Sequence, residues 1–232
     1  MGVRPGKLVG KPERKSEMTP LDAEEAPFDA PSGERPAVRR PRDAATLILV
    51  RGGREVLMGQ RAGGHAFMPD KWVFPGGAVE RGDARAPAAS ELRPEVEAQL
   101  RYGGVRRAPR AFALAAARET LEETGLMLGG TEGPDMARLS LICRAITPPY
   151  RPRRFDARFF LADAAALLAD DAPMPGAELV HTAWVGLEAA ESLDLPAITR
   201  FVLAEVRSRL AGEARGPAYL RWVRGGHQLD RI

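Results

Sequence analysis

The chain has 232 residues, which suits one domain with extensions, and 44% of them are hydrophobic, enough for a core. Its 34 Lys and Arg nearly balance its 31 Asp and Glu, so the basic pI does not indicate nucleic-acid binding. A single cysteine, Cys143, excludes an intramolecular disulfide and a multi-cysteine zinc site. No apolar run reaches the ~18–20 residues of a membrane span, and the N-terminus lacks the apolar core of a signal peptide, so we expect a cytoplasmic protein without a membrane partner.

The pattern along the chain predicts one α/β domain with extensions. Residues 1–42 contain seven prolines and few large apolar residues, which predicts an extended lead-in before a domain over 43–212 and a C-terminal tail over 213–232. Strands are expected at 44–50, 55–61, 72–74, 78–80, 139–146, 155–161 and 178–187. Helices are expected at 94–101, 111–124 and 195–210, with a helical turn at 163–168. Interleaved strands and helices, together with hairpins, indicate a mixed sheet sandwiched between helices.

Three glutamates, Glu119, Glu122 and Glu123, are spaced i, i+3 and i+4 along the expected helix over 111–124. At 3.6 residues per turn they crowd onto one helix face, where like charges repel each other. A hard divalent cation such as Mg²⁺ or Mn²⁺ prefers carboxylate oxygens and would offset this repulsion. The spacing therefore predicts a divalent-metal site, and the alternative is a glutamate-rich face that is merely solvated.

A glycine turn precedes this helix in the sequence. Phe74-Pro75-Gly76-Gly77 is followed by Asp83 and then by Arg118-Glu119-Thr120-Leu121-Glu122-Glu123-Thr124-Gly125-Leu126. This order resembles the box of the Nudix hydrolase superfamily: Gly, five residues, Glu, seven residues, then an Arg-Glu core ending in Glu-Glu-any-Gly-aliphatic. Gly77 and the Arg-Glu core fit the pattern, while Asp83 stands in the position of a glutamate.

The segment 84–110 is expected to be an insertion, because 34 residues separate Asp83 from Arg118 where the pattern has seven. The entropy of closing a loop grows only with the logarithm of its length, about 0.6 kcal/mol per doubling, so the turn can still pack on the helix. A branch of the superfamily similar to peroxisomal and mitochondrial acyl-CoA diphosphatases has an insertion at this place. Three further motifs look like that branch: Phe67-Met68-Pro69-Asp70, Ile146-Thr147-Pro148-Pro149 and the stretch 153–160.

The resemblance implies a Nudix-type α/β/α sandwich that hydrolyses a small-molecule nucleoside diphosphate substrate with metal-activated water. It implies Mg²⁺ or Mn²⁺ as cofactor, held by Glu119, Glu122, Glu123 and a backbone carbonyl of the Gly77 turn, and it gives Arg118 the role of bracing the helix against the loop. Acyl-CoA or CoA is the substrate it favours. The alternatives are hydrolysis of ADP-ribose, a nucleotide sugar or a dinucleotide and, from a different class, ligand sensing without catalysis.

Two roles stay open between several residues. Glu119 and Glu178 are both candidates for the general base, and His181 is a third on the same expected strand as Glu178. Candidates for contact with the substrate are two glycines, whose backbone can approach a phosphate, and three arginines: Gly76, Gly77, Arg153, Arg154 and Arg158. For the arginines, the alternative is an exposed position beside a strand. The sequence is compatible with a homodimer.

Overall fold

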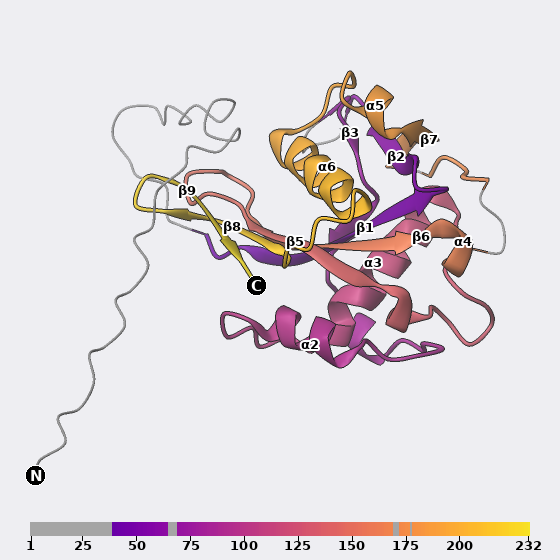
Figure 1. Ribbon diagram of the computed structural model, residues 1–232, viewed down its shortest axis with the longest axis horizontal. Coiled ribbons are helices and arrows are strands. Elements are labelled where there is room, and N and C mark those ends of the chain that lie inside the picture. The colour runs from indigo at the N-terminus through magenta and orange to yellow at the C-terminus, as the bar shows by residue number, and fades with distance from the viewer. Residues whose placement is uncertain (1–38, 65–68, 169–171, 177) are drawn as a thin grey trace, which may run out of the picture.

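The computed structural model describes residues 39–64, 69–168, 172–176 and 178–232. Most of the predicted N-terminal lead-in, together with Phe67 and Met68 of one quoted motif, lies outside the described residues. Within these ranges the chain forms one large mixed β-sheet with helices on both faces (Figure 1). The predicted α/β class, with its mixed sheet between helices, is confirmed.

Most elements lie within a few residues of the positions that the sequence predicts. The strands are β1 (Arg42–Arg51), β2 (Glu55–Arg61), β3 (Trp72–Val73), β4 (Gly76–Ala78), β5 (Ser140–Ile146), β6 (Phe155–Asp163), β7 (Leu179–Gly186), β8 (Ala218–Val223) and β9 (Gly226–Arg231). The α-helices are α2 (Pro94–Arg101), α3 (Pro109–Thr124), α4 (Ala164–Leu167), α5 (Leu187–Ala190) and α6 (Ala197–Leu210). Short 3-10 helices, η1 (Asp83–Arg85) and η2 (Met136–Arg138), flank the segment that carries α2 and α3.

The sheet has the strand order β3-β2-β1-β6-β5-β8-β9, with β4 paired to β1 and β7 paired to β2. The β1–β6 and β5–β8 pairs are parallel, and the other pairs are antiparallel. Strand β1 is central and buried on both faces, which explains its unbroken apolar run Leu47-Ile48-Leu49-Val50. The glycine turn enters the sheet as β4, so its backbone is fixed by the β1 ladder.

Helix α3 covers one face of the sheet and carries the predicted glutamates. Pro109 occupies its first turn, where no intrahelical N–H is required, so the helix begins two residues earlier than predicted. It ends at Gly125, whose left-handed φ of 70° favours glycine and whose N–H bonds the carbonyl of Leu121. Phe112 is fully buried against β1 residues such as Leu47, and this packing fixes the helix on the sheet.

Helix α6 covers the opposite face (Figure 1). Pro196 is its N-cap residue, as the sequence indicates, and Val202, Leu203 and Val206 pack into the second half of the core. The two core clusters therefore lie on opposite faces of one sheet, the arrangement expected of an α/β/α sandwich. Within the described residues, no helix combines the length and the apolar character that crossing a membrane requires.

The prediction of a C-terminal tail over 213–232 is wrong. Residues 218–231 form the hairpin β8–β9, and β8 pairs in parallel with β5 through Cys143 and Ala145. The hairpin turns at Arg224-Gly225, where both residues have positive φ. Ala218, Tyr219 and Leu220 of β8 are consecutive and all buried, so the strand lacks the alternation of apolar and polar residues that marks a half-buried strand, and its position depends on pairing with a distant strand.

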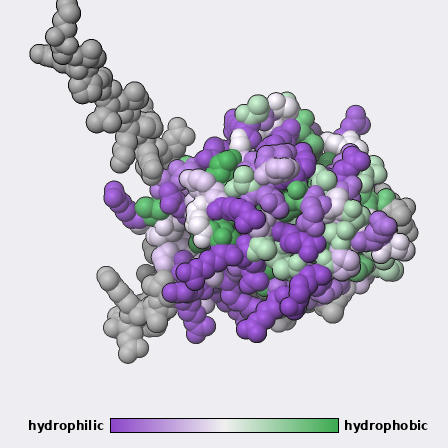
Figure 2. Space-filling view, turned by 90° about the horizontal axis from the view of Figure 1, so that it is seen from below, coloured by the Kyte–Doolittle hydropathy of each residue, from purple (hydrophilic) through white to green (hydrophobic). Residues whose placement is uncertain are grey.

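The segment between β4 and α3 packs beneath α3 and includes η1 and α2. Val96 and Leu100 of α2 are buried in the core cluster around Phe112. The surface on this side is largely hydrophilic (Figure 2). Ion pairs such as Arg101–Glu97 and Arg110–Glu91 contribute to it. The segment therefore folds against the sheet without separating β4 from α3.

Candidate active site

The last two turns of α3 hold the three glutamates in different environments. The Glu119 side chain is 15% exposed and that of Glu122 is 57% exposed. Glu123 is 3% exposed. The sequence predicts one crowded face, and the structure resolves it into one buried, one half-shielded and one solvated carboxylate. Because their exposure differs, the three carboxylate side chains differ in their freedom to change rotamer.

The glycine turn lies directly against these glutamates. The N–H of Gly76 donates to Glu123 Oε2 at 2.8 Å. A Cβ on Gly77 would lie 2.5 Å from Glu119 Oε1, so any other residue there would displace the Glu119 carboxylate from its present position. A Cβ on Gly76 would lie 2.6 Å from the carbonyl oxygen of Ala45 in β1. Glycine is therefore required at position 76 by the close approach of the β1 backbone, and glycine at position 77 leaves the space that the Glu119 carboxylate occupies.

Arg118 joins the helix to the chain that follows the turn. Its guanidinium donates to both oxygens of Asp83, at 2.9 and 3.3 Å, and to the carbonyl of Ala78 at 3.0 Å. The same group bonds Glu119 at 2.9 Å and Glu122 at 3.0 Å. Burial lowers its pKa, but the Asp83 hydrogen bond and the charges of Glu119 and Asp83 outweigh that effect and raise the pKa overall. Arg118 is therefore positively charged and holds Asp83, the turn and two glutamates together.

Burial sets the charge state of the carboxylates. It raises the pKa of Glu123 to about 7, against the opposing hydrogen bond from Gly76 and the charge of Arg61. Burial also raises the pKa of Glu119, although the Arg118 charge opposes it. Among the described residues, Glu123 Oε1 is buried without a hydrogen-bond partner. A cation beside this carboxylate would satisfy the orphaned oxygen and favour the ionised form.

The site fits a hard divalent cation in its donor chemistry. It offers carboxylate oxygens on one rigid helix, an orphaned oxygen on Glu123, and a glycine backbone that a Cβ would obstruct. Over the ranges that the structure describes, no three His, Cys, Asp or Glu side chains already form a metal-holding group. Arg118 donates to both Glu119 and Glu122, so these carboxylates would share their oxygens between the guanidinium and a cation.

Glu178 lies immediately before β7 and lines the same cavity as Glu119. Its charge raises the pKa of both Glu119 and Glu123, so the three carboxylates share one electrostatic environment. Arg61, at the end of β2, lies 3.8 Å from Glu178 and lowers the pKa of Glu123. The chain before Glu178 is fixed to α3, because Gly176 N–H donates to the Glu123 carbonyl at 3.0 Å. His181 is exposed on β7.

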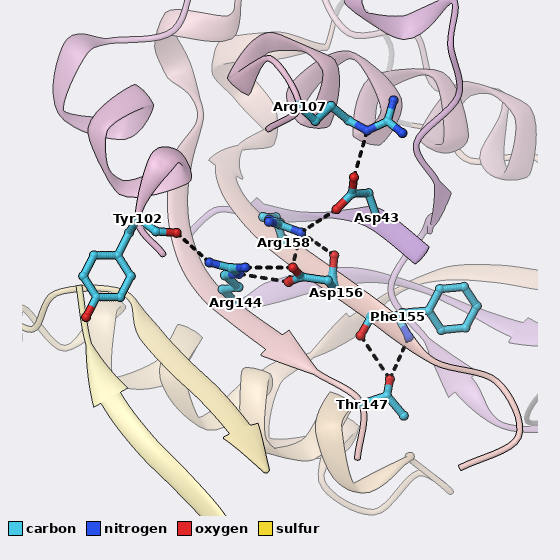
Figure 3. Close-up of polar contacts among 8 residues, drawn as sticks. All are labelled: Asp43, Tyr102, Arg107, Arg144, Thr147, Phe155, Asp156 and Arg158. Atoms are coloured by element: carbon cyan, nitrogen blue, oxygen red, sulfur yellow. Dashed lines mark hydrogen bonds and ion pairs between the residues drawn. The ribbon is translucent and has the colours of Figure 1, made fainter. Parts of the chain in front are cut away.

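The three predicted phosphate-contacting arginines separate in the structure. Arg153 is exposed and lines the cavity described below. Arg154 does not line it and donates to the carbonyls of Thr147 and Arg39. Thr147 in turn bonds both the N–H and the carbonyl of Phe155, which fixes the base of the arginine-rich loop (Figure 3).

Arg158 does not reach the cavity, which corrects its assignment as a substrate contact. It is fully buried, stacks 4.1 Å from the Phe112 ring centre, and pairs with Asp156 at 3.0 Å and Asp43 at 3.3 Å (Figure 3). The same two carboxylates bind Arg144 and Arg107, so the network ties the segment before α3 to the sheet. Strand alternation explains the position, since Ala157 and Phe159 point to the cavity and Arg158 to the α3 side.

A cavity of about 720 Å³ opens beside Glu119. Its lining includes the glycine turn, Glu178 and several arginines that the sequence reasoning did not single out. Those additional residues are Arg42, Arg61 and Arg151. Arg42 and Arg61 stand at strand ends, and nothing in the local pattern distinguishes them from solvated strand-end arginines. The cavity thus combines carboxylates at one wall with cations that suit phosphate groups.

Comparisons with known proteins identify the fold. No family model matches the chain. A solved structure of a NUDIX hydrolase from Alicyclobacillus acidocaldarius is 28% identical, covers 74% of this chain and 93% of its own, and superposes with a TM-score of 0.56. The chain has the Nudix fold. The NUDIX domain of Shewanella oneidensis NrtR, solved with ADP ribose, shares the fold at a TM-score of 0.50 and 14% identity, covering 77% of this chain and 94% of that one.

A curated Caenorhabditis elegans protein named nudix hydrolase 7 is 31% identical over 162 residues. The match takes in 57% of this chain and 46% of that protein, so the chain spans about half the length of this curated relative. This chain is therefore similar in sequence and fold to proteins described as Nudix hydrolases. The Nudix-like sequence motif and the Nudix fold coincide at α3 and the glycine turn.

Proposed function

We propose that the chain is a metal-dependent hydrolase of a nucleoside diphosphate-linked substrate. The observation that carries the proposal is the direct contact of α3 with the glycine turn, through the 2.8 Å bond from Gly76 to Glu123 and the contact of Gly77 with Glu119. The glycine turn and α3 are in contact although 34 residues separate Asp83 from Arg118. A diphosphate is hydrolysed slowly unless its negative charge is neutralised and a water is activated, and carboxylates that can hold a cation beside an arginine-lined cavity suit both tasks.

In this proposal Glu119, Glu122, Glu123 and the Gly77 carbonyl hold Mg²⁺ or Mn²⁺. When bound, the metal supplies charge neutralisation for the diphosphate and lowers the pKa of a water. Arg118 keeps the carboxylates in place, because its donors to Asp83 and Ala78 fix the helix against the turn. The glycine backbone leaves room for a phosphate oxygen to approach.

The general base in this proposal is Glu119 or Glu178. Glu119 lines the cavity next to the turn, and its raised pKa makes it a better proton acceptor than an ordinary carboxylate. Glu178 also lines the cavity, and Gly176, two residues before it, is anchored to the Glu123 carbonyl. The pH–rate profile of Glu178→Gln would assign the role, because Glu119→Gln also removes a proposed metal ligand. Loss of the acidic limb in Glu178→Gln assigns the base to Glu178, and an unchanged limb assigns it to Glu119.

Phosphate binding is assigned to cavity arginines. Arg153 from the β5–β6 loop and Arg61 at the end of β2 both line the cavity. A guanidinium matches two phosphate oxygens and remains charged at every physiological pH. Gly76 and Gly77 add backbone contacts at the same end. Arg158 is left out because it is buried on the other face of the sheet.

The substrate we favour is acyl-CoA or CoA, on the sequence resemblance to acyl-CoA diphosphatases. ADP-ribose, a nucleotide sugar or a dinucleotide is the alternative, and the neighbour solved with ADP ribose shares the fold. A screen with purified protein and Mn²⁺ separates these substrates by their products. Adenosine 3′,5′-bisphosphate plus a phosphopantetheine product supports the CoA proposal, because CoA carries a phosphate on the ribose 3′ position, and AMP plus ribose phosphate supports hydrolysis of ADP-ribose. Turnover of no diphosphate in a broad panel would refute hydrolysis and favour a ligand sensor.

A further inference from the structure

The loop between β4 and α2 supplies Asp83, the carboxylate that Arg118 binds. Asp83 is 4% exposed and is the first residue of η1. Its Oδ2 accepts the N–H of Glu80 at 2.7 Å and also receives the Arg118 guanidinium at 3.3 Å. Because Arg118 donates to Glu119 as well, a shift of this loop would move the carboxylate that lines the cavity.

Little within the loop fixes its shape. The 3-10 helix η1 has three residues, and its N-cap residue, Gly82, has no side chain to cap it. Its backbone bonds run from the Arg85 N–H to the Gly82 carbonyl at 2.9 Å and from the Ala86 N–H to the Asp83 carbonyl at 3.3 Å. Short 3-10 segments have poorer hydrogen-bond geometry than α-helices, so contacts from outside the loop must contribute to its order.

Arg107, at the end of the inserted segment, holds the side of the loop that precedes η1. Its Nη1 donates to the Glu80 carbonyl at 3.4 Å, and its Nε donates to Asp43 Oδ2 at 2.9 Å (Figure 3). Asp43 is fixed in turn, because its carbonyl accepts the Val79 N–H at 2.9 Å and its Oδ1 pairs with the buried Arg158 at 3.3 Å. Arg107 therefore ties the loop to the start of β1.

Arg110, in the first turn of α3, holds the other side of the loop. Its Nη1 donates to the Ala84 carbonyl at 2.7 Å and its Nη2 to the Ala86 carbonyl at 3.3 Å. These carbonyls belong to η1 and to the residue directly after it. The pair of Arg110 with Glu91 adds little, because the Glu91 side chain is 63% exposed. Arg110 therefore bonds η1 from the helix that carries Glu119.

Both arginines lie outside the cavity. Among the described residues, the cavity lining includes neither Arg107 nor Arg110, and it does not include Asp83. Their side chains are partly exposed, and Asp43 keeps Arg158 as a partner when Arg107 is removed. Replacement of either arginine should therefore leave the fold intact, and any effect on a reaction in the cavity must pass through the loop.

We propose that Arg107 and Arg110 form a clamp on η1 that positions Arg118 and, through it, Glu119 for catalysis. The proposal rests on the proposed metal-dependent hydrolysis and assigns two positioning residues to it. Asp83 is held from both sides, by Arg107 through Glu80 and by Arg110 through the carbonyls of η1. The segment between β4 and α3 thereby supports the site that it interrupts in the sequence.

Steady-state kinetics of Arg107→Ala and Arg110→Ala, with CoA and ADP-ribose at saturating Mn²⁺, test this role. Residues that position ligands without touching substrate typically contribute 10–100-fold, so kcat should fall by about tenfold or more in both variants. KM should change by less than about twofold, because the clamp does not reach the cavity. Arg106→Ala is the matched control at an exposed neighbouring position and should have wild-type kinetics. Unchanged kcat, or a raised KM at unchanged kcat, would overturn the clamp.

A double-mutant cycle tests whether the clamp acts through Asp83. Asp83→Ala removes both oxygens that Arg118 binds. If Arg107 acts only by placing Asp83, adding Arg107→Ala to Asp83→Ala should lower kcat by less than about twofold further. Losses that multiply would mean that Arg107 acts by another route and would refute the positioning role.

Hydrogen exchange in the presence of a chelator tests the clamp without metal or substrate. Amides of residues 78–86 should exchange about fivefold faster in Arg107→Ala and in Arg110→Ala, and at the wild-type rate in Arg106→Ala. Unchanged exchange in either clamp variant would overturn the proposal. Faster exchange in a protein that hydrolyses no diphosphate supports the clamp and refutes the proposed hydrolysis, so the two failures are distinguishable.

Discussion

The substitution Glu123→Gln tests whether the buried Glu123 carboxylate makes the stability of the protein depend on pH. The pKa of Glu123 is raised from 4.5 to about 7 by burial, so the folded protein disfavours the ionised form. This group's contribution to stability is present below pH 4.5 and is lost as the pH rises through 7. At about 1.4 kcal/mol per pKa unit, the loss is about 3 kcal/mol. Glutamine cannot ionise, and its unpartnered NH₂ group costs about 1–3 kcal/mol at every pH.

The assay is urea unfolding of both proteins with a chelator at pH 5 and pH 9. The difference in unfolding free energy should shift in favour of Glu123→Gln by about 2–3 kcal/mol between these two pH values. Glu122→Gln is the matched control, because it removes a neighbouring carboxylate whose side chain is 57% exposed. Its difference in unfolding free energy from wild type should be the same at both pH values within about 0.5 kcal/mol. If the difference in unfolding free energy between Glu123→Gln and wild type did not change with pH, the raised pKa of the buried Glu123 carboxylate would be refuted. Turnover should fall by orders of magnitude in Glu123→Gln, because a proposed metal ligand is removed.

Three further changes test the contacts and the strand pairing that hold the site in place. Arg118→Lys keeps the charge but cannot donate to Asp83 and the Ala78 carbonyl at once, so calorimetry should show a stability loss of about 1–2 kcal/mol and kinetics at least a tenfold lower turnover. Gly176→Ala brings a Cβ within 2.7 Å of the Glu122 carbonyl and should lower turnover, whereas Gly186→Ala meets nothing within 4 Å and should not. Removal of residues 213–232 exposes the edge of β5 and should give an unfolded or insoluble product by circular dichroism and sedimentation.

Each of these expectations can fail separately. Wild-type stability in Arg118→Lys would mean that the contacts of the guanidinium fork are not needed to hold the turn. Equal turnover by Gly176→Ala and Gly186→Ala would show that the contact between Gly176 and α3 is not needed to position Glu178. A soluble, cooperatively folding truncation would show that the hairpin adds little to the sheet.

Local signals were sufficient for most of the fold. Pro109 and Gly125 fix the two ends of α3 by backbone chemistry, and the prediction missed only its first two residues. Strand β2 has the predicted bounds because its apolar run lies between a double-glycine turn and a glycine-rich loop. The neighbourhood of Glu119 and Gly77 was also predictable, since a known family pattern couples these two distant segments.

Long-range pairing was not predictable in the same way. The β8–β9 hairpin finds its place by pairing with β5, more than 70 residues earlier, and the apolar face of β8 became significant only through this partner. The local signals that could have identified it are the Arg224-Gly225 turn and the strand-forming residues Tyr219, Trp222 and Val223 before it. Arg158 was assigned to the substrate because single-strand alternation does not say which face meets the cavity. The sheet register decides that, and it places Arg158 with Asp156 and Phe112.

The central claim is that α3 and the glycine turn together bind a divalent cation. Crystals of the wild-type protein soaked with Mn²⁺ test it directly by anomalous difference maps. The account predicts a peak in contact with carboxylates of Glu119, Glu122 and Glu123 and with the Gly77 carbonyl, and no such peak in Glu119→Gln. A Mn²⁺ peak elsewhere in the protein, or none at a concentration that supports turnover, would contradict it.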